Sequence, residues 1–370
     1  MKILLAFDSF KGSLSAMEAC RAAKEGILKT HPGAEITMLP LADGGEGTVR
    51  AVTDALRGDT VRVRVNDPLG KKITAHYSVL SGATAVMEMS AASGIMLIKN
   101  EHLNPNITST FGTGEMLISA LDRGVGSIII GIGGSATNDA GTGMLRALGA
   151  RFLDGDGNVL PEGGRALIDL ERIDLSCFDK RILKKRLIVA CDVDSTLCGE
   201  NGATRMFARQ KGASDDDIEV LEKALMNFGT VSHNQLGKDL LTLRGGGAAG
   251  GLGAALCAYC GGTLQSGFET VSGVVGLEDE IERADIVITG EGKTDYSSFL
   301  GKVPVGVLSA AKEKGKPCVL LSGDITCEND ILLSMGFSAV HKARPDNVTV
   351  KRAMSRAAFY LSRAAEGAIA

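Results

Sequence analysis

The chain has 370 residues, of which 44% are hydrophobic and 23% charged, and its formal net charge is −4. This composition is globular, and the length exceeds what one hydrophobic core usually serves, so we expect two domains. The balanced charge, the absence of Trp and an aromatic content of 4% argue against nucleic acid as a partner, because that partner favours a basic stripe and stacking rings.

Glycine is the residue type in excess, with 48 of 370 positions against an average of about 7%. The glycines are bunched into a few loops, which makes those loops the first place to look for function. The eight cysteines and five histidines show no metal-site spacing, and Cys257 and Cys260 are expected to be buried thiols. The apolar run at residues 2–7 is too short for a signal peptide, and residues 245–268 carry too much glycine for a bilayer span. We therefore expect a cytoplasmic protein with no membrane partner.

The first 60 residues predict two strand–helix units. Residues 2–7 are a continuous apolar run, as expected of a buried parallel strand, and Ser13 can cap a helix that ends at His31-Pro32-Gly33. A second strand is predicted at 35–39 and a second helix at 44–56.

The middle of the chain has a different rhythm. Short strands at 60–65, 73–79 and 85–89 are joined by turns and are more antiparallel in character. They are followed by a helix at 113–122, a buried strand at 127–132, a helix at 140–148 and a buried strand at 187–191. Residues 254–260 are expected to form a helix of small residues.

The strand–helix rhythm returns at the end of the chain. Strands are predicted at 285–289, 318–322 and 338–341, and helices at 303–314 and 351–367. The fold class is therefore α/β: a flavodoxin-like, doubly wound parallel sheet in a discontinuous domain (1–60 plus 275–370), with a mixed α/β domain (61–274) inserted. A cleft between two such domains is a common place for a small-molecule site.

A glycine loop at residues 131–143 is the clearest candidate for an anion site. It follows a strand and opens a helix, so backbone N–H groups and the positive helix end can point at a phosphate. Gly133 and Gly134 allow close approach, while Ser135, Thr137 and Asn138 offer further donors. Asp139 would then hold a metal ion or a sugar hydroxyl. The alternative is a tight strand–helix turn that binds nothing.

A second glycine loop, at residues 245–253, also precedes a helix, with Gly246 and Gly247 as candidate phosphate contacts. Two such loops suggest a ligand with more than one anionic group, such as a nucleoside triphosphate plus an acid substrate. Close helix contact through small residues is the alternative.

Three more loops place charges at predicted strand ends, where doubly wound folds bind their ligands. A lysine beside a helix N-terminus suits a transferring phosphoryl group, and paired acids can hold a cation. The candidates for substrate or metal are Asp8, Ser9, Asp43, Glu46, Glu291, Lys293 and Asp295, and those for phosphate are Lys11 and Lys302. The alternatives are a solvated Lys11 paired with Asp8, acids at Asp43 and Glu46 that only favour a helix N-terminus, and Lys302 as an ordinary surface lysine.

Asp192 follows the strand at 187–191 and is a candidate general base or magnesium ligand. With Asp194 it also forms a D-x-D-x-T pattern, which is typical of phosphatases with an aspartyl-phosphate intermediate. In that alternative, Asp324 and Glu328 would supply the second acidic motif.

Taken together, these loops resemble those of the bacterial glycerate kinase family that forms 2-phosphoglycerate, and the resemblance extends over nearly the whole chain. The resemblance is carried by six motifs in order: residues 8–13, 40–48, 133–141, 245–251, 290–295 and Gly301-Lys302. The chain departs from the family at Ser195-Thr196, where Asn-Pro is usual, and at Lys293 and Ser297, where Arg and Gln are common.

The resemblance implies two α/β domains and an ATP-dependent kinase that phosphorylates a hydroxyl of D-glycerate with Mg²⁺, by in-line transfer in the interdomain cleft. In this hypothesis Lys11 contacts the γ-phosphate, residues 133–138 the nucleotide phosphates, and Asp192 is the base. Asp43, Glu291 and Asp295 are candidates for Mg²⁺ or substrate. A non-catalytic nucleotide sensor stays open as an alternative. The sequence does not decide between the 2- and 3-hydroxyl, which domain holds ATP, or the oligomeric state.

Overall fold

The structure, a computed structural model, describes residues 1–45, 47–299 and 302–369. The chain divides into two compact units. Unit 1 comprises Met1–Asp43, Arg50–Arg57 and Gly267–Ala370, and unit 2 comprises Gly44–Val49 and Gly58–Ser266.

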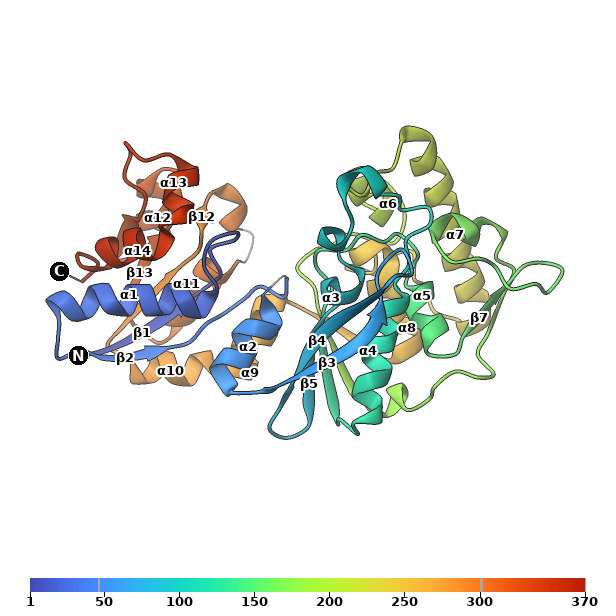
Figure 1. The fold of residues 1–370 in the computed structure, drawn as a ribbon, viewed down its shortest axis with the longest axis horizontal. Coiled ribbons are helices and arrows are strands. Elements are labelled where there is room, and N and C mark those ends of the chain that lie inside the picture. Colours follow the sequence, from blue (N-terminus) through green and yellow to red (C-terminus); the bar gives the residue numbers. More distant parts are fainter. Residues whose placement is uncertain (46, 300–301, 370) are drawn as a thin grey trace. The chain divides into compact units, whose positions relative to one another are not determined.

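Unit 1 is built on a five-stranded parallel sheet (Figure 1). Its order is β15-β13-β11-β1-β2. The strands are β1 (Lys2–Phe7), β2 (Glu35–Met38), β11 (Ile286–Gly290), β13 (Cys318–Ser322) and β15 (Ala339–Lys342). Because the strands are parallel, the loops that follow them gather at one edge of the sheet.

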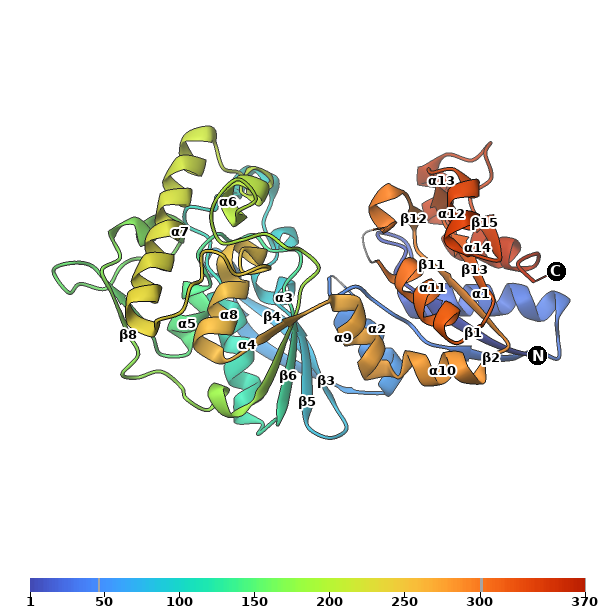
Figure 2. The ribbon, with the colours of Figure 1, turned by 180° about the vertical axis from the view of Figure 1, so that it is seen from behind.

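Helices cover both faces of this sheet, and the alternation of side chains along β1 shows why. Ile3, Leu5 and Phe7 share a core with α1 (Ala16–Thr30) and α14 (Ala357–Ala365). Residues between them point to the opposite face, where α10 (Leu277–Arg283) and α11 (Val303–Glu313) contact β1. Accordingly, α1 lies in front of the sheet in Figure 1 and α11 in front of it in Figure 2.

The remaining elements of unit 1 are short. They are α2 (Thr48–Leu56), which begins in the last residues of a unit 2 segment, α9 (Gly267–Val275), β12 (Lys293–Thr294), the 3-10 helix η7 (Tyr296–Phe299), β14 (Asp324–Ile325), α12 (Asn329–Met335) and α13 (Val350–Ser355).

Two expectations about unit 1 were wrong in detail. The cap of α1 is Ser15, not Ser13: Ser15 and Glu18 form a capping box, whereas the Ser13 hydroxyl donates to the Phe10 carbonyl at 2.8 Å. The predicted final helix is two helices, α13 and α14, because Arg356 between them has a non-helical backbone (φ −132°, ψ 30°).

Unit 2 is built on a six-stranded mixed sheet with the order β10-β9-β6-β5-β4-β3. The strands are β3 (Asp59–Asn66), β4 (Lys72–Leu80), β5 (Thr84–Glu88), β6 (Ser127–Gly131), β9 (Arg186–Ala190) and β10 (Thr263–Gln265). β3, β4 and β5 pair antiparallel, as expected from their turns, and the pairs β5–β6, β6–β9 and β9–β10 are parallel. A separate antiparallel pair, β7 (Arg151–Leu153) and β8 (Arg172–Asp174), lies outside this sheet.

One extensive core joins the sheet of unit 2 to its helices. The helices are α3 (Ser90–Ser93), α4 (Phe111–Asp122), α5 (Thr142–Ala147), α6 (Ala203–Phe207), α7 (Asp215–Leu236) and α8 (Leu252–Cys260). The 3-10 turns are η1 (Ile95–Leu97), η2 (Asn100–His102), η3 (Gly164–Asp169), η4 (Ile182–Lys184), η5 (Arg209–Lys211) and η6 (Ala248–Gly251). Among the described residues, none of the helices combines the length and the apolar character needed to cross a bilayer.

Candidate functional site

Asp8 stands at the carboxyl end of β1 and is almost completely buried. Its N–H donates to the Gly290 carbonyl at 2.9 Å, and its Oδ1 accepts the Ser9 N–H at 2.6 Å. Burial, and then the negative charge of Asp43, raises the pKa of Asp8 from 3.8 to about 7, and Glu291 acts in the same direction. The Ser9 hydrogen bond and the charge of Lys11 oppose the rise. Unit 1 therefore gathers the acids of three predicted loops around one strand end.

Glu291 follows β11 at the same edge and is also buried. Its Oε1 accepts the Thr294 hydroxyl at 3.2 Å, and burial raises its pKa above the ordinary value while the charge of Lys302 opposes that rise. The glycines on either side are required by close backbone contacts: a Cβ on Gly290 would lie 1.9 Å from the Leu321 carbonyl oxygen, and one on Gly292 would lie 3.0 Å from Phe10 Cα. Glu291 is thus held in place by the packing of its own loop.

The other candidate charges of unit 1 are more open. Lys11 is exposed, Ser9 and Asp43 are half-buried, and Lys302 is the half-buried cap residue of α11. Lys293 and Asp295 form an ion pair with 2.9 Å between Nζ and Oδ2, so each already has a partner. Glu46, also expected to hold substrate or metal, lies outside the described residues.

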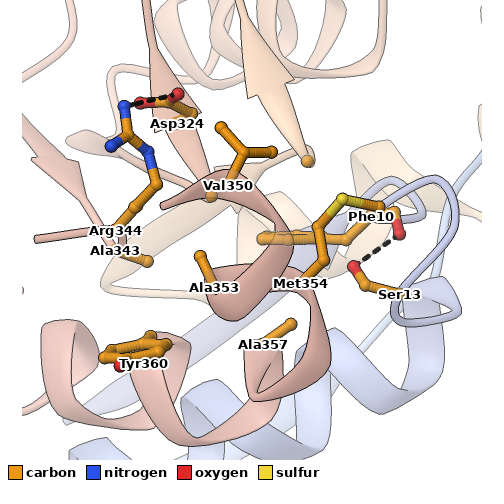
Figure 3. A pocket seen from close by; sticks show the side chains of 12 residues that line it. Phe10, Ser13, Asp324, Ala343, Arg344, Val350, Ala353, Met354, Ala357 and Tyr360 are labelled. Carbon is orange, nitrogen blue, oxygen red and sulfur yellow. Dashed lines mark hydrogen bonds and ion pairs between the residues drawn. The ribbon is translucent and has the colours of Figure 1, made fainter. Parts of the chain in front are cut away.

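A pocket of about 60 Å³ opens beside the turn that carries Lys11. The Phe10–Ser13 side of this turn and the helices α13 and α14 form its walls, with Met354 beside Phe10 (Figure 3). Its polar end is closed by Arg344, which binds both Asp324 oxygens at 2.8 and 3.0 Å. Asp324 is therefore committed to an internal ion pair.

The carboxylates of the described residues do not form a closed metal site. Within residues 1–45, 47–299 and 302–369 there is no group of three or more His, Cys, Asp or Glu side chains that could hold a metal ion. A magnesium ion usually takes only one or two carboxylates from the protein, with water and substrate phosphates completing its shell. The acids around Asp8 fit that use.

In unit 2, the loop after β6 presents donors with no acceptor. Gly133 and Gly134 are exposed, and within the described chain the N–H groups of Gly133, Gly134 and Ser135 make no hydrogen bond. Consecutive free N–H groups of this kind form anion-binding concavities. Within unit 2, the segment that starts at Gly44 packs against the end of β6 and this loop: a Cβ on Gly131 would be 2.3 Å from the Gly44 carbonyl oxygen, and a Cβ on Gly133 would be 3.2 Å from Gly45 Cα.

The same loop corrects the expected role of Asp139. This side chain is fully buried, and it accepts hydrogen bonds from Thr110 N, Thr110 Oγ1, Gly141 N and Gly143 N at 2.8–3.2 Å. It therefore occupies the N-terminus of α5, which was expected to receive a phosphate. Its carboxylate is not positioned to hold a metal ion or a sugar hydroxyl at the surface.

Thr137 and Asn138 also differ from expectation. Both side chains are fully buried, and Asn138 Nδ2 donates to Thr204 Oγ1 at 3.0 Å. Neither side chain is at the surface to donate to a phosphate. The exposed, donor-bearing part of the loop is limited to residues 133–135.

The second glycine loop serves packing, which was the alternative to phosphate binding. Gly246 and Gly247 are buried, and a Cβ on Gly247 would lie 2.0 Å from the Thr196 carbonyl oxygen. A Cβ on Gly250 would lie 2.2 Å from the Thr137 carbonyl oxygen. Backbone segments approach here at distances that exclude any side chain, so the loop joins the Thr196 turn to the first glycine loop.

Asp192 is exposed just beyond β9, and its Oδ1 accepts the Ser266 hydroxyl at 3.2 Å. Asp194 is exposed as well. Ser195, at a position where the chain departs from the family pattern, is buried, and its Oγ has no partner within the described residues. The turn after β9 thus presents two acids outward and one hydroxyl inward.

Sequence reasoning overlooked Lys211, whose side chain is buried under the first glycine loop. Its Nζ donates to Ser135 Oγ at 2.8 Å and to the Thr137 carbonyl at 2.7 Å. No local pattern distinguishes this lysine from a surface lysine, because its two partners lie more than 70 residues earlier in the chain.

Comparisons with known proteins agree with this architecture. The model of the family described as "Glycerate kinase family" matches residues 3–370. A relative from Bacillus subtilis (strain 168), named Glycerate kinase, is 44% identical over 99% of this chain and 96% of its own length. Another from Escherichia coli (strain K12), named Glycerate 2-kinase, is 44% identical over 92% of this chain and 90% of its own length.

The fold has a solved counterpart. A crystal structure from Salmonella typhimurium LT2, whose name also includes the words glycerate kinase, superposes with a TM-score of 0.90 at 44% identity and covers 99% of this chain and 96% of its own. These matches place the protein among the α/β kinases. More narrowly, the chain belongs to the glycerate kinase family.

Proposed function

We propose that this protein phosphorylates D-glycerate with ATP and forms 2-phosphoglycerate. The observation that carries the proposal is the run of free N–H groups at Gly133, Gly134 and Ser135, in a chain of the glycerate kinase family. Free donors of this kind suit the phosphates of a nucleotide. The 2-hydroxyl as acceptor rests on the name of the Escherichia coli relative.

Phosphoryl transfer depends on positioning and on positive charge more than on covalent chemistry by the protein. In the proposal, residues 133–135 bind nucleotide phosphates, and the exposed amine of Lys11 contacts the γ-phosphate. Asp43, Glu291 and Asp295 are the acids proposed to hold Mg²⁺, which would neutralise phosphate charge when bound. Asp192 would accept the proton of the attacking hydroxyl.

The proposal also keeps the expected organisation of the chain: a discontinuous flavodoxin-like domain with a mixed α/β domain inserted. Counted along unit 1, the order of the five parallel strands is 2-1-3-4-5, the order associated with flavodoxin-like sheets. The sheet of unit 2 is mixed, in keeping with the second part of the expectation.

The phosphatase alternative is not favoured. The comparisons point to kinases, and Asp324, which would have belonged to its second acidic motif, is bound on both oxygens by Arg344.

The test is an assay of ADP release with ATP and Mg²⁺, with and without D-glycerate. Release that depends on D-glycerate is expected, and phosphorus NMR of the product should show the phosphate on the 2-hydroxyl. ADP release that is unchanged by D-glycerate would overturn the kinase proposal. A product phosphorylated on the 3-hydroxyl would overturn only the assignment of the acceptor.

A further inference from the structure

Lys211 is a buried lysine to which the proposed function assigns no role. It is 2% exposed, and the turn that carries it is fixed on both sides. Lys211 N donates to the Ala208 carbonyl at 3.0 Å, and Gly212, with φ +96°, packs so closely that a Cβ would lie 2.4 Å from the Leu103 carbonyl oxygen. Burying an amine is costly unless its N–H groups find acceptors, so a lysine in this place calls for an explanation.

The two acceptors of Lys211 both belong to the loop with the free N–H groups. The Nζ atom reaches Ser135 Oγ and the Thr137 carbonyl from the inner side of the loop. A charged lysine has donors and no acceptor, so Ser135 Oγ must accept this bond. The Ser135 hydroxyl proton is then left to point away from Lys211, and Ser135 is half-exposed next to Gly133 and Gly134.

We propose that Lys211 is the positioning residue of this anion loop. From the inner side it orients the Ser135 hydroxyl as a fourth donor beside the three free N–H groups, and it supplies positive charge beneath bound phosphate without touching the ligand. The inference rests on the proposed function, because it takes the phosphate groups of a nucleotide as the ligand of this loop.

The charge of Lys211 responds to the ligand. Burial lowers the pKa of Lys211 to about 7, and within the described chain Asp139 is the ionisable group whose charge opposes this shift. Burial also raises the pKa of the Asp139 carboxyl, which limits that opposition. Above that pH the unliganded protein therefore holds Lys211 mostly neutral. A bound anion favours the charged form, so nucleotide binding should be accompanied by proton uptake.

The first experiment uses the wild-type protein and ADP. Calorimetric titrations at about pH 8, in buffers of different ionisation enthalpy, measure the protons taken up per ADP bound. We expect uptake of a substantial fraction of one proton. Binding without any uptake contradicts the proposed change of charge at Lys211, whereas the positioning role is overturned by the variants described below.

The second experiment compares Lys211→Met with Lys223→Met, a matched change at an exposed lysine on α7. Lys211→Met should weaken ADP binding and raise KM for ATP by about tenfold or more, leave KM for D-glycerate nearly unchanged, and abolish the proton uptake. Lys223→Met should alter none of these. A folded Lys211→Met protein with wild-type ADP affinity and uptake would refute the proposal.

A third variant covers the case in which Lys211→Met does not fold. Ser135→Ala removes the hydroxyl donor, so it should weaken ADP binding several-fold. It keeps Lys211 and its bond to the Thr137 carbonyl, so the proton uptake should be retained. Loss of uptake in Ser135→Ala would contradict the assignment of the proton to Lys211. If the wild-type protein binds no ADP and shows no turnover, the proposed function fails. If it binds and turns over but the folded Lys211→Met or Ser135→Ala protein binds ADP as tightly as the wild type, only this inference fails.

Discussion

The carboxylate of Asp139 holds Thr110 by two bonds of 2.8 Å, one from its backbone nitrogen and one from its hydroxyl. This pair ties the start of α4 to the N-terminus of α5, since the same carboxylate also accepts the N–H groups of Gly141 and Gly143. The bond pattern predicts a structural role that can be measured.

Asp139→Asn should lower the free energy of unfolding by about 2–4 kcal/mol, because an amide NH₂ would face donors that need an acceptor inside the protein. Urea unfolding measures this change, and Asp156→Asn, at an exposed loop position, is the control. A loss below about 0.5 kcal/mol would show that the carboxylate is not needed at this helix end.

Asp8→Asn should stabilise the protein at alkaline pH. The folded-state pKa of Asp8 is raised from 3.8 to about 7, so the native state prefers the protonated form. The contribution of Asp8 to the stability of the wild-type protein is therefore lost as pH rises from about 4 to 7, and the asparagine variant has no such loss. We expect a Tm several degrees above wild type at about pH 8 and close to wild type at about pH 4.

The control for this pH effect is Asp59→Asn, at an exposed strand start. It should shift Tm little and equally at both pH values. A Tm difference for Asp8→Asn that does not grow with pH would contradict the raised pKa.

Lys11→Met should lower kcat by about 10²–10³, because a positive charge placed on a transferring phosphoryl group acts mainly in the transition state. Lys11→Arg should retain part of the rate, since it keeps the charge. Steady-state kinetics with ATP and D-glycerate provide the measurement, with Lys180→Met as a control at an exposed lysine. Equal rates for Lys11→Met and the control would remove Lys11 from the proposed site.

Asp192→Asn should lower kcat by about 10²–10⁴ and leave ATP binding nearly unchanged, as expected of a general base. Asp194→Asn is the paired variant, because Asp194 is equally exposed two residues away. It should have a much smaller effect. A near-normal kcat for Asp192→Asn would show that another group accepts the proton of the attacking hydroxyl.

Ser195→Ala should be neutral or stabilising by up to about 1 kcal/mol, because the buried Ser195 hydroxyl has no partner among the described residues. Thr204→Val provides the contrast: it leaves Asn138 Nδ2 without its acceptor and should cost about 1–3 kcal/mol. Urea unfolding of the two variants should therefore give opposite or clearly unequal changes. Equal losses would mean that Ser195 has a partner after all.

Elements with a strong local signal were predictable from the sequence. Continuous apolar runs predicted strands β1 and β13, and the turn between the next strands predicted the antiparallel pairing of β3 with β4. Helix α7 was overlooked although Ser214 and Asp217 form a capping box at its start, a pattern that a search for helix caps would have found.

The site was less predictable, because its chemistry depends on burial. In the sequence, Asp139 and Asp192 are both acids close to a strand end, and either suits a ligand. In the structure Asp139 is buried and accepts four hydrogen bonds, whereas Asp192 is exposed. The deciding partner of Asp139, Thr110, lies 29 residues earlier, a distance at which no local pattern operates.

The split composition of unit 1 has a consequence for synthesis on the ribosome. Strand β1 lies inside the sheet, between β2 and β11. Its residue Leu4 pairs with Val287, so the hydrogen bonds between β1 and β11 cannot form until Val287 has been synthesised. Unit 2 has all six strands of its main sheet once Gln265 has been made. We therefore expect the insert to fold first during translation, while the amino-terminal strand stays incompletely paired and relies on chaperones until the last third of the polypeptide emerges.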